Sequence, residues 1–168
     1  MQGYIQIYTG NGKGKTTAAL GQAIRAVGAG KKVFFAQFVK GQPYSELEAL
    51  KRFPEINIKQ YGLGCFIEKE PSENDINAAE KGLKEVAETV LNNQYDLVIM
   101  DEIFIALYYK LINLADLKKI IDQKPKQMEI IMTGRYAPPT MLEIANLVTE
   151  MKEIKHYFNN GIMARKRI

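Results

Sequence analysis

The chain has 168 residues, of which 46% are hydrophobic and 25% charged, and its formal net charge is +4. This is the composition of an ordinary globular protein, which excludes disordered and collagen-like chains, and the length fits one domain over residues 1–168. The positive charge suits anionic partners such as nucleotide phosphates, but it is spread along the chain, and the short basic run at 164–168 is typical of a solvated tail, so we expect no nucleic-acid partner.

Cysteine usage and hydropathy favour a soluble protein of a reducing compartment. Cys65 is the single cysteine, so neither an internal disulfide nor a thiolate metal site is available. No basic leader is followed by an apolar run, and no apolar run approaches the roughly 20 residues that span a bilayer. We therefore expect a cytoplasmic protein without a membrane segment.

Hydrophobic periodicity predicts strands and helices in alternation. A short apolar run at 4–8 ends at a glycine-rich turn, which indicates a buried strand, and the alanine-rich segment that follows has helical spacing. In chain order, we expect strands at 4–8, 32–39, 56–61, 96–100 and 128–132, and helices at 16–27, 46–52, 72–92, 114–122 and 138–146. Alternation with short loops favours an α/β fold with a mostly parallel central sheet and helices on both faces. Such sheets bind ligands at the carboxyl ends of their strands.

Residues 9–17, TGNGKGKTT, join the first predicted strand to the first predicted helix. Backbone N–H groups at a helix N-terminus form a cradle for phosphate, and glycine lets oxygens approach closely. Lys15 and Lys13 supply positive charge, and the Thr16 hydroxyl is of the kind that completes a magnesium shell. The usual phosphate-loop pattern begins with glycine where this chain has Thr9, but a merely flexible turn has no use for two lysines. We expect a triphosphate-binding loop in a phosphate-loop NTPase (RecA-like) architecture. The residues expected to bind the triphosphate are Gly10, Asn11, Gly12, Lys13, Gly14, Lys15, Thr16 and Thr17.

A second polar feature follows the apolar run at 97–100, where Asp101 and Glu102 end a predicted buried strand. In phosphate-loop folds this acidic end lies next to the loop of the first strand, where Asp or Glu holds magnesium directly or through water. The alternative is a pair of solvated carboxylates that cap the next helix. In combination with the glycine loop, we favour the metal site.

With these features the chain resembles the ATP:corrinoid adenosyltransferases of the cobalamin pathway, of the phosphate-loop type. The resemblance runs from end to end and rests on TGNGKGKTTAA at 9–19, MDE at 100–102, TGRYAPP at 133–139 and LVTEMKEIKH at 147–156. It implies that a reduced Co(I) corrinoid attacks the ribose 5′ carbon of ATP and expels tripolyphosphate, with ATP bound in reverse relative to most phosphate-loop enzymes. The loop amides, Lys13, Lys15 and magnesium would then stabilise the charge of the leaving triphosphate.

The resemblance also implies roles for individual residues. Thr16 and Glu102 are expected to contact the metal, Mg²⁺ or alternatively Mn²⁺, with Asp101 as an outer or alternate ligand. Arg135 carries a forked donor suited to phosphate, although a structural salt bridge would use the same group. The residues expected to act in catalysis are Lys13, Lys15, Glu102 and Arg135.

The corrinoid-facing segment of the family reads Gly-x-Gly-Phe-x-Trp, whereas the same stretch here, at 62–67, reads GLGCFI, and the chain has no tryptophan. By position, the resemblance assigns corrinoid contact to Gly64, Cys65, Phe66 and Ile67. Phe66 is expected to take over part of the apolar wall that removes the axial ligand of cobalt, and Cys65 to be a small packed residue. His156, the only histidine, is expected to be structural and to lie at a strand end.

Members of the family commonly carry an N-terminal arm that closes over the corrinoid, whereas this chain begins almost at its first predicted strand. The family also implies a homodimer, and the basic charge is compatible with a flavodoxin-like reductase. Two other functions share the loop: a phosphate-loop ATPase or small-molecule kinase, and a nucleotide- or corrinoid-binding protein without transferase activity. Their products differ, because the transferase releases tripolyphosphate and the ATPase or kinase releases ADP.

Overall fold

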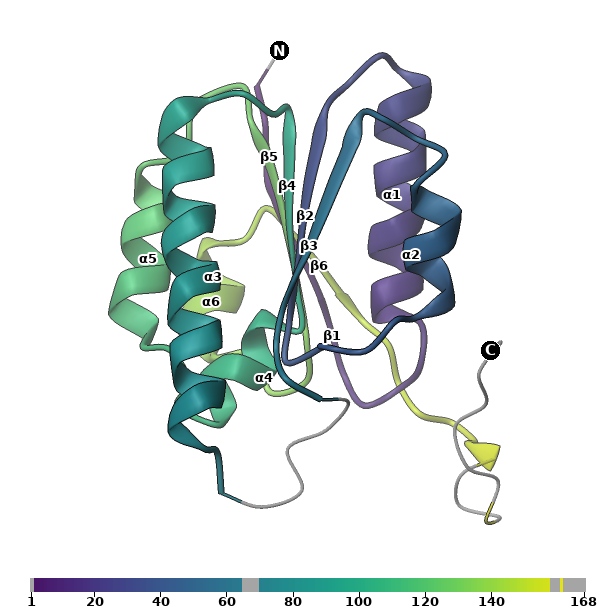
Figure 1. Ribbon diagram of the computed structural model, residues 1–168, viewed down its shortest axis with the longest axis vertical. Helices are drawn as coiled ribbons and strands as arrows, with labels where there is room; N and C mark the ends of the chain where they lie inside the picture. The colour runs from purple at the N-terminus through teal and green to yellow at the C-terminus, as the bar shows by residue number, and fades with distance from the viewer. Residues whose placement is uncertain (1, 65–69, 158–160, 162–168) are drawn as a thin grey trace.

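A six-stranded parallel sheet forms the centre of the part of the chain that the computed structural model describes, residues 2–64, 70–157 and 161 (Figure 1). Its strands are β1 (Ile5–Thr9), β2 (Val33–Phe38), β3 (Ile56–Tyr61), β4 (Leu97–Asp101), β5 (Glu129–Thr133) and β6 (Leu147–Glu150). They lie in the order β3-β2-β4-β5-β1-β6, and each pairing between neighbours is parallel. The predicted α/β fold with a mostly parallel sheet is therefore confirmed.

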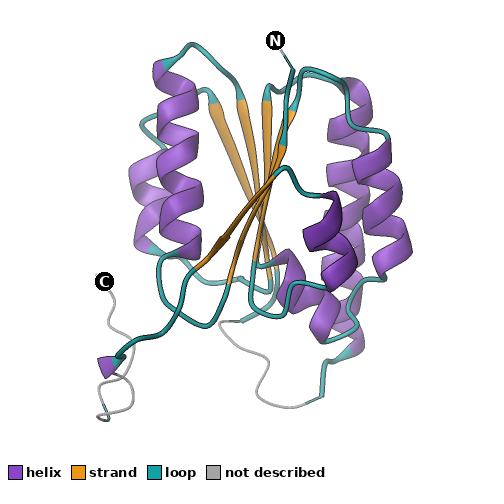
Figure 2. Cartoon of the chain, turned by 180° about the vertical axis from the view of Figure 1, so that it is seen from behind, coloured by secondary structure: helices purple, strands orange, loops and turns teal. Residues whose placement is uncertain are grey.

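Helices cover both faces of this sheet. They are α1 (Lys15–Gly28), α2 (Ser45–Leu50), α3 (Glu73–Asn92), α4 (Ile103–Tyr108), α5 (Leu114–Asp122) and α6 (Pro139–Ile144). Helices α1 and α2 lie on one side of the sheet and the other four on the opposite side, which the view from behind shows equally (Figures 1 and 2). Among the described residues, none of the helices has both the length and the apolar character needed to cross a membrane.

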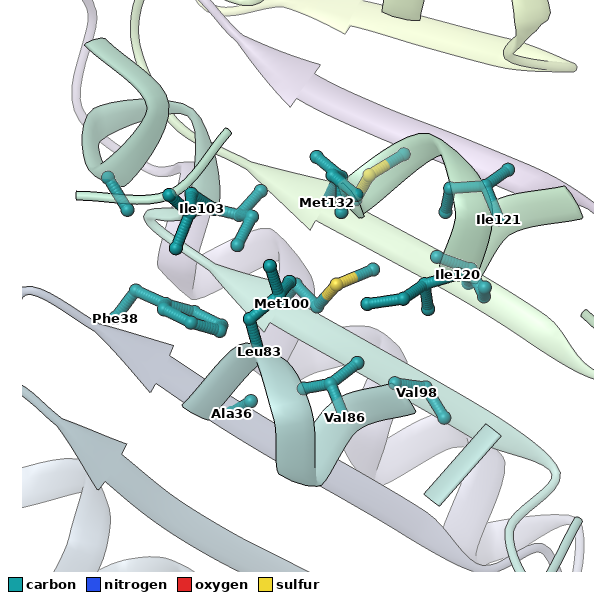
Figure 3. Close-up of a cluster of buried hydrophobic side chains, with 14 of the residues drawn as sticks. Ala36, Phe38, Leu83, Val86, Val98, Met100, Ile103, Ile120, Ile121 and Met132 are labelled. Carbon is teal, nitrogen blue, oxygen red and sulfur yellow. The ribbon is translucent and has the colours of Figure 1, made fainter. Parts of the chain in front are cut away.

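The core consists of one hydrophobic cluster on each face of the sheet. The larger cluster joins the sheet to α3 and α5 and includes Phe38, Leu83 and Val86 (Figure 3). The smaller cluster lies under α1 and includes Ala23 and Phe35. Every residue of β2 and of β4 is buried, because helices cover both faces of these central strands.

Two elements were not predicted from the sequence. Helix α4 begins directly after Glu102, and its six residues IFIALY are too few to display helical periodicity. Strand β6 is exposed at all four positions, so it lacks the burial pattern by which strands are recognised. It lies at the edge of the sheet and pairs with β1 alone.

The strand order determines where ligands can approach. The chain leaves β1 through α1 and enters β2, which is separated from β1 by β4 and β5. Because the sheet is parallel, the carboxyl ends of its strands lie on the same side. The segments that follow β1, β2, β4 and β5 therefore meet there, at the lower end of the sheet in Figure 1. Open α/β sheets bind ligands outside the carboxyl ends of their strands, at the point where the chain reverses its direction across the sheet.

Candidate active site

The glycine loop between β1 and α1 curls around the side chain of Lys15. Gly10 and Gly14 have φ values of +95° and +117°, in the left-handed region that favours glycine. Lys15 Nζ donates hydrogen bonds of 2.8 Å to the carbonyl oxygens of both Gly10 and Gly12, and the residue is only 6% exposed. Burial lowers the pKa of Lys15, and the charge of Glu102 offsets part of this effect. The predicted phosphate loop therefore holds a buried ammonium group at its centre.

The chain beyond β6 braces this loop from outside. The Gly12 amide donates to the carbonyl oxygen of Met151 at 2.7 Å, and the Met151 amide donates to that of Thr9 at 2.8 Å. Lys13 Nζ lies 2.7 Å from the hydroxyl of Tyr157. Met151 and Tyr157 were not among the residues expected at the site, because nothing in their local sequence shows that the chain returns to the loop.

Asp101 is fully buried and accepts hydrogen bonds from two strands, β2 and β5, and from the first turn of α1. Thr16 Oγ1, in the first turn of α1, donates to Asp101 Oδ1 at 3.0 Å, and Thr133 Oγ1 of β5 donates to the same oxygen at 2.7 Å. Gln37 of β2 lies 3.4 Å from Oδ2. Strand β5 lies between β1 and β4, yet the acidic strand end still meets the loop, as the sequence predicted.

Lys40 completes this cluster, and the sequence analysis missed it. Its Nζ lies 2.8 Å from Asp101 Oδ2 and 3.2 Å from Thr16 Oγ1, and its side chain is 15% exposed. Burial opposes the charged form, but the neighbouring carboxylates, Asp101 above all, raise the pKa of Lys40 above its ordinary value. One sequence signal could have identified Lys40: it lies two residues past a fully buried strand, at the carboxyl end of the sheet, where the glycine loop also lies.

Glu102 occupies the N-cap position of α4 with a φ of +57°, but its side chain makes no capping hydrogen bond. Its amide donates to Thr133 Oγ1 at 3.0 Å. Burial, followed by the charge of Asp101, raises the pKa of Glu102, while Lys40 and Lys15 counteract this shift. The helix-capping alternative thus finds no support in the side-chain contacts, and the carboxylate lies among the charged groups of the loop.

Arg135 links the loop after β5 to the glycine loop. Its Nη2 lies 3.4 Å from the carbonyl oxygen of Asn11, and the side chain is exposed. The contact that the structure gives it is with this carbonyl oxygen, which leaves the guanidinium group at the rim of the loop. Asn11 and Thr17 are also exposed.

The oxygens of this cluster fit a hard divalent cation such as Mg²⁺. Thr16 offers a hydroxyl, and Asp101 and Glu102 offer carboxylates, which are the ligand types that Mg²⁺ prefers. Within the described ranges, no group of three or more His, Cys, Asp or Glu side chains is placed to hold a metal. A magnesium ion at this position would therefore need oxygens from water and from a bound phosphate, as is usual for this ion.

The expected corrinoid contacts are only partly visible. Gly64 follows β3, and its carbonyl oxygen accepts a hydrogen bond of 2.9 Å from the Gly41 amide. Cys65, Phe66 and Ile67 lie outside the described residues. His156 lies beyond the end of β6 rather than at it, and its ring is 4.7 Å from that of Tyr157.

Comparison with known proteins agrees with the geometry. The sequence matches the family described as ATP:corrinoid adenosyltransferase BtuR/CobO/CobP over residues 1–168. Corrinoid adenosyltransferase of Pseudomonas aeruginosa is 37% identical over 99% of this chain and 83% of its own length, and that of Escherichia coli K12 is 34% identical over 98% and 84%. Corrinoid adenosyltransferase CobA of Salmonella typhimurium is 34% identical over 99% and 85%.

A solved structure supports the fold alone. The flagellar accessory protein FlaH of Methanocaldococcus jannaschii matches with a TM-score of 0.61 at 15% identity, over 89% of this chain and 71% of that chain. The chain thus shares with this protein the predicted α/β fold, a parallel sheet with helices on both faces. Together with the family match over the full length, the relatives above 30% identity confirm the resemblance inferred from the four motif segments. The chain therefore belongs to the ATP:corrinoid adenosyltransferase family.

Proposed function

We propose that the protein transfers the 5′-deoxyadenosyl group of ATP to the Co(I) centre of a reduced corrinoid and releases tripolyphosphate. The observation that carries this proposal is the family match over residues 1–168, which includes the compact GNGKGKTT loop. In the reaction, the electron pair of Co(I) forms the cobalt–carbon bond while the bond from the 5′ carbon to oxygen breaks, and its electrons leave with the triphosphate. The protein's task is to stabilise this departing negative charge.

The glycine loop is suited to that task. Its amides, with Lys15 at the centre and Lys13 at the rim, would surround the triphosphate and stabilise it more strongly as the charge on the leaving oxygen grows. Lys15 Nζ donates to the loop's own carbonyl oxygens, and phosphate oxygens would replace these acceptors. Arg135 at the rim adds a second cationic group that can fork onto phosphate oxygens.

We propose Mg²⁺, with Mn²⁺ as the alternative, as the cofactor, held through Thr16 and Glu102 with Asp101 as an outer ligand. When bound, the ion supplies positive charge to the triphosphate oxygens. Phe66 would take over part of the apolar wall under the cobalt. A homodimer, a flavodoxin-like reductase as electron donor and a cytoplasmic location complete the proposal, and gel filtration with light scattering tests the dimer.

The decisive experiment incubates the protein with ATP, Mg²⁺ and a chemically reduced corrinoid and follows the spectrum for a cobalt–carbon bond. We expect this bond to form with release of one tripolyphosphate for each adenosyl group transferred. Release of ADP that does not depend on corrinoid would instead indicate an ATPase or kinase. Tight corrinoid binding without adenosylation would indicate a binding protein.

A further inference from the structure

Lys40 contacts two of the oxygen-bearing side chains of the proposed metal site, Thr16 and Asp101. It follows β2, and its ammonium group contacts both the Thr16 hydroxyl at 3.2 Å and the Asp101 carboxylate at 2.8 Å. These two oxygens come from the helix after the glycine loop and from the end of β4. Because Asp101 is fully buried, its charge needs a cationic partner, and Lys40 supplies one from within the chain.

We propose that Lys40 is a built-in counter-ion that keeps the metal-free site intact and that a divalent cation displaces. The inference rests on the proposed function in one respect, that the cation site includes Thr16 and Asp101. It assigns Lys40 a positioning role: the side chain holds these two oxygens in place until Mg²⁺ arrives, and it competes with Mg²⁺ for them.

The two cations compete because both interact with the oxygens of Thr16 and Asp101, the metal ion with Asp101 directly or through water. An ammonium group has three donors and no acceptor, so it has no attractive contact to offer a metal ion. Thr16 Oγ1 donates its proton to Asp101 and accepts from Lys40, which uses one of the lone pairs that a metal would need. Two positive groups at this short range and in a mostly buried site repel each other strongly. Metal binding therefore requires the Lys40 ammonium to leave.

The backbone around Lys40 is fixed, so the displacement involves the side chain. The Val39 amide donates to the Tyr61 carbonyl oxygen at 3.1 Å, and the Gly41 amide donates to the Gly64 carbonyl oxygen at 2.9 Å. Gly62 approaches so closely that a Cβ there would come within 2.6 Å of the Lys40 amide nitrogen. Rotation of the long lysine side chain about its own bonds remains available and leaves these contacts unchanged.

The test measures Mg²⁺ binding without nucleotide or corrinoid. Wild type and the Lys40→Met variant are titrated with MgCl₂ by isothermal calorimetry, and melting temperatures are followed in parallel. We expect Lys40→Met to melt below wild type without metal, because Asp101 loses its partner, and to bind Mg²⁺ about tenfold more tightly or better. Lys40→Gln keeps a hydrogen-bond donor without the charge, and we expect it to change Mg²⁺ affinity and melting temperature in the same directions. It replaces Lys40→Met in the test if Lys40→Met fails to fold.

The chain provides a matched control on the same two strands. Lys31 precedes β2 and pairs with Asp96, which precedes β4, at 2.9 Å on the opposite edge of the sheet. Lys31→Met should bind Mg²⁺ as wild type does, whereas Asp101→Asn in the Lys40→Gln background should abolish the gain. Equal or weaker Mg²⁺ binding by both Lys40 variants, or binding by none of the proteins, overturns the proposal. Because no corrinoid is present, the outcome is independent of whether the protein is an adenosyltransferase.

Discussion

Lys15 differs from the flexible surface lysine that its place in a loop suggests. Its ammonium group is buried and donates hydrogen bonds to two carbonyl oxygens of the glycine loop, which tie the loop to the start of α1. Lys15→Ala removes this cation and two charge-assisted hydrogen bonds. We expect ATP affinity, measured by calorimetry, to fall about 10- to 100-fold and adenosylation to be lost.

Lys13→Ala is the control for the loop, because Lys13 is exposed and its contact is with the Tyr157 hydroxyl. Its loss should weaken ATP binding less than the loss of Lys15 does. If Lys15→Ala binds ATP as tightly as wild type, the loop has no part in holding the triphosphate.

Glu102 gives a prediction about pH. Burial and the charge of Asp101 raise its pKa in the folded protein above the ordinary value of 4.5. The fold therefore favours the protonated form, and the stability that this contributes is fully present below the unfolded pKa and is lost as pH rises through the folded pKa. In metal-free buffer near neutral pH, Glu102→Gln should raise Tm by about 2–4 °C, the effect of ~1 kcal/mol in a chain of this size, and by less as the pH falls toward 4.

The same variant should require more Mg²⁺ for activity, because it lacks a charged oxygen ligand, and excess Mg²⁺ should restore part of the rate. The measurement is the adenosylation rate as a function of Mg²⁺ concentration. An unchanged Mg²⁺ dependence would exclude Glu102 from the metal site.

At the residue scale, the sequence predicts what is local. The glycine loop is one continuous stretch of sequence, and so is the pair Asp101 and Glu102. They lie beside each other because the carboxyl ends of parallel strands lie on the same side of the sheet. Gln37 and Lys40 come from β2 and the residues just after it, and Thr133 comes from β5. Their contacts with Asp101 depend on the strand order, which periodicity along the chain does not reveal.

At the scale of elements, the glycine loop depends on β6. A Cβ on Gly12 would come within 2.6 Å of the Met151 carbonyl oxygen, and the Gly12 amide binds that same oxygen. Gly12→Ala must therefore push the loop and the segment after β6 apart. We expect a loss of about 1–3 kcal/mol in the free energy of unfolding and clearly weaker ATP binding, measured by denaturant titration and calorimetry.

Gly21→Ala is the matched control within the next helix. Gly21 lies in α1, and no atom lies within 4 Å of a Cβ built there. Because alanine favours the helix over glycine, this variant should gain roughly 0.5–1 kcal/mol and keep its ATP affinity. Wild-type stability and ATP binding in Gly12→Ala would show that β6 does not brace the loop.

The elements that escaped prediction share a physical cause. Strand β6 has no buried face, and α4 is a short helix of six residues that begins at the left-handed backbone of Glu102. Both are held by tertiary contacts: β6 by its pairing with β1, and α4 by its contacts with β2 and β5. By contrast, the helix predicted at 72–92 begins where expected, because Ser72 and Asp75 form a capping box at its N-terminus, which is a local signal.

At the scale of the whole molecule, the two hydrophobic clusters share one sheet. The larger contains Tyr61 and Val86, and the smaller contains Tyr8, so tyrosine fluorescence reports on both faces of a chain that has no tryptophan. The central strands β2, β4 and β5 contribute side chains to both clusters. We propose that the chain unfolds as one unit, because both hydrophobic clusters are lost once the strands of the sheet come apart.

The variant Val86→Ala tests this proposal, because it creates a cavity on the α3 face of the sheet. The helix that follows the glycine loop, α1, lies on the opposite face. Val86 is fully buried, and its truncation should lower the free energy of unfolding by about 2 kcal/mol. If the molecule is one cooperative unit, far-UV circular dichroism and tyrosine fluorescence should show a single coincident transition, shifted by the same amount in both. ATP affinity below that transition should stay at the wild-type value, since the loop is held by β1, α1 and β6 rather than by α3. Two separate transitions, with the smaller cluster keeping its wild-type midpoint, would show that the layers on the two faces of the sheet fold independently.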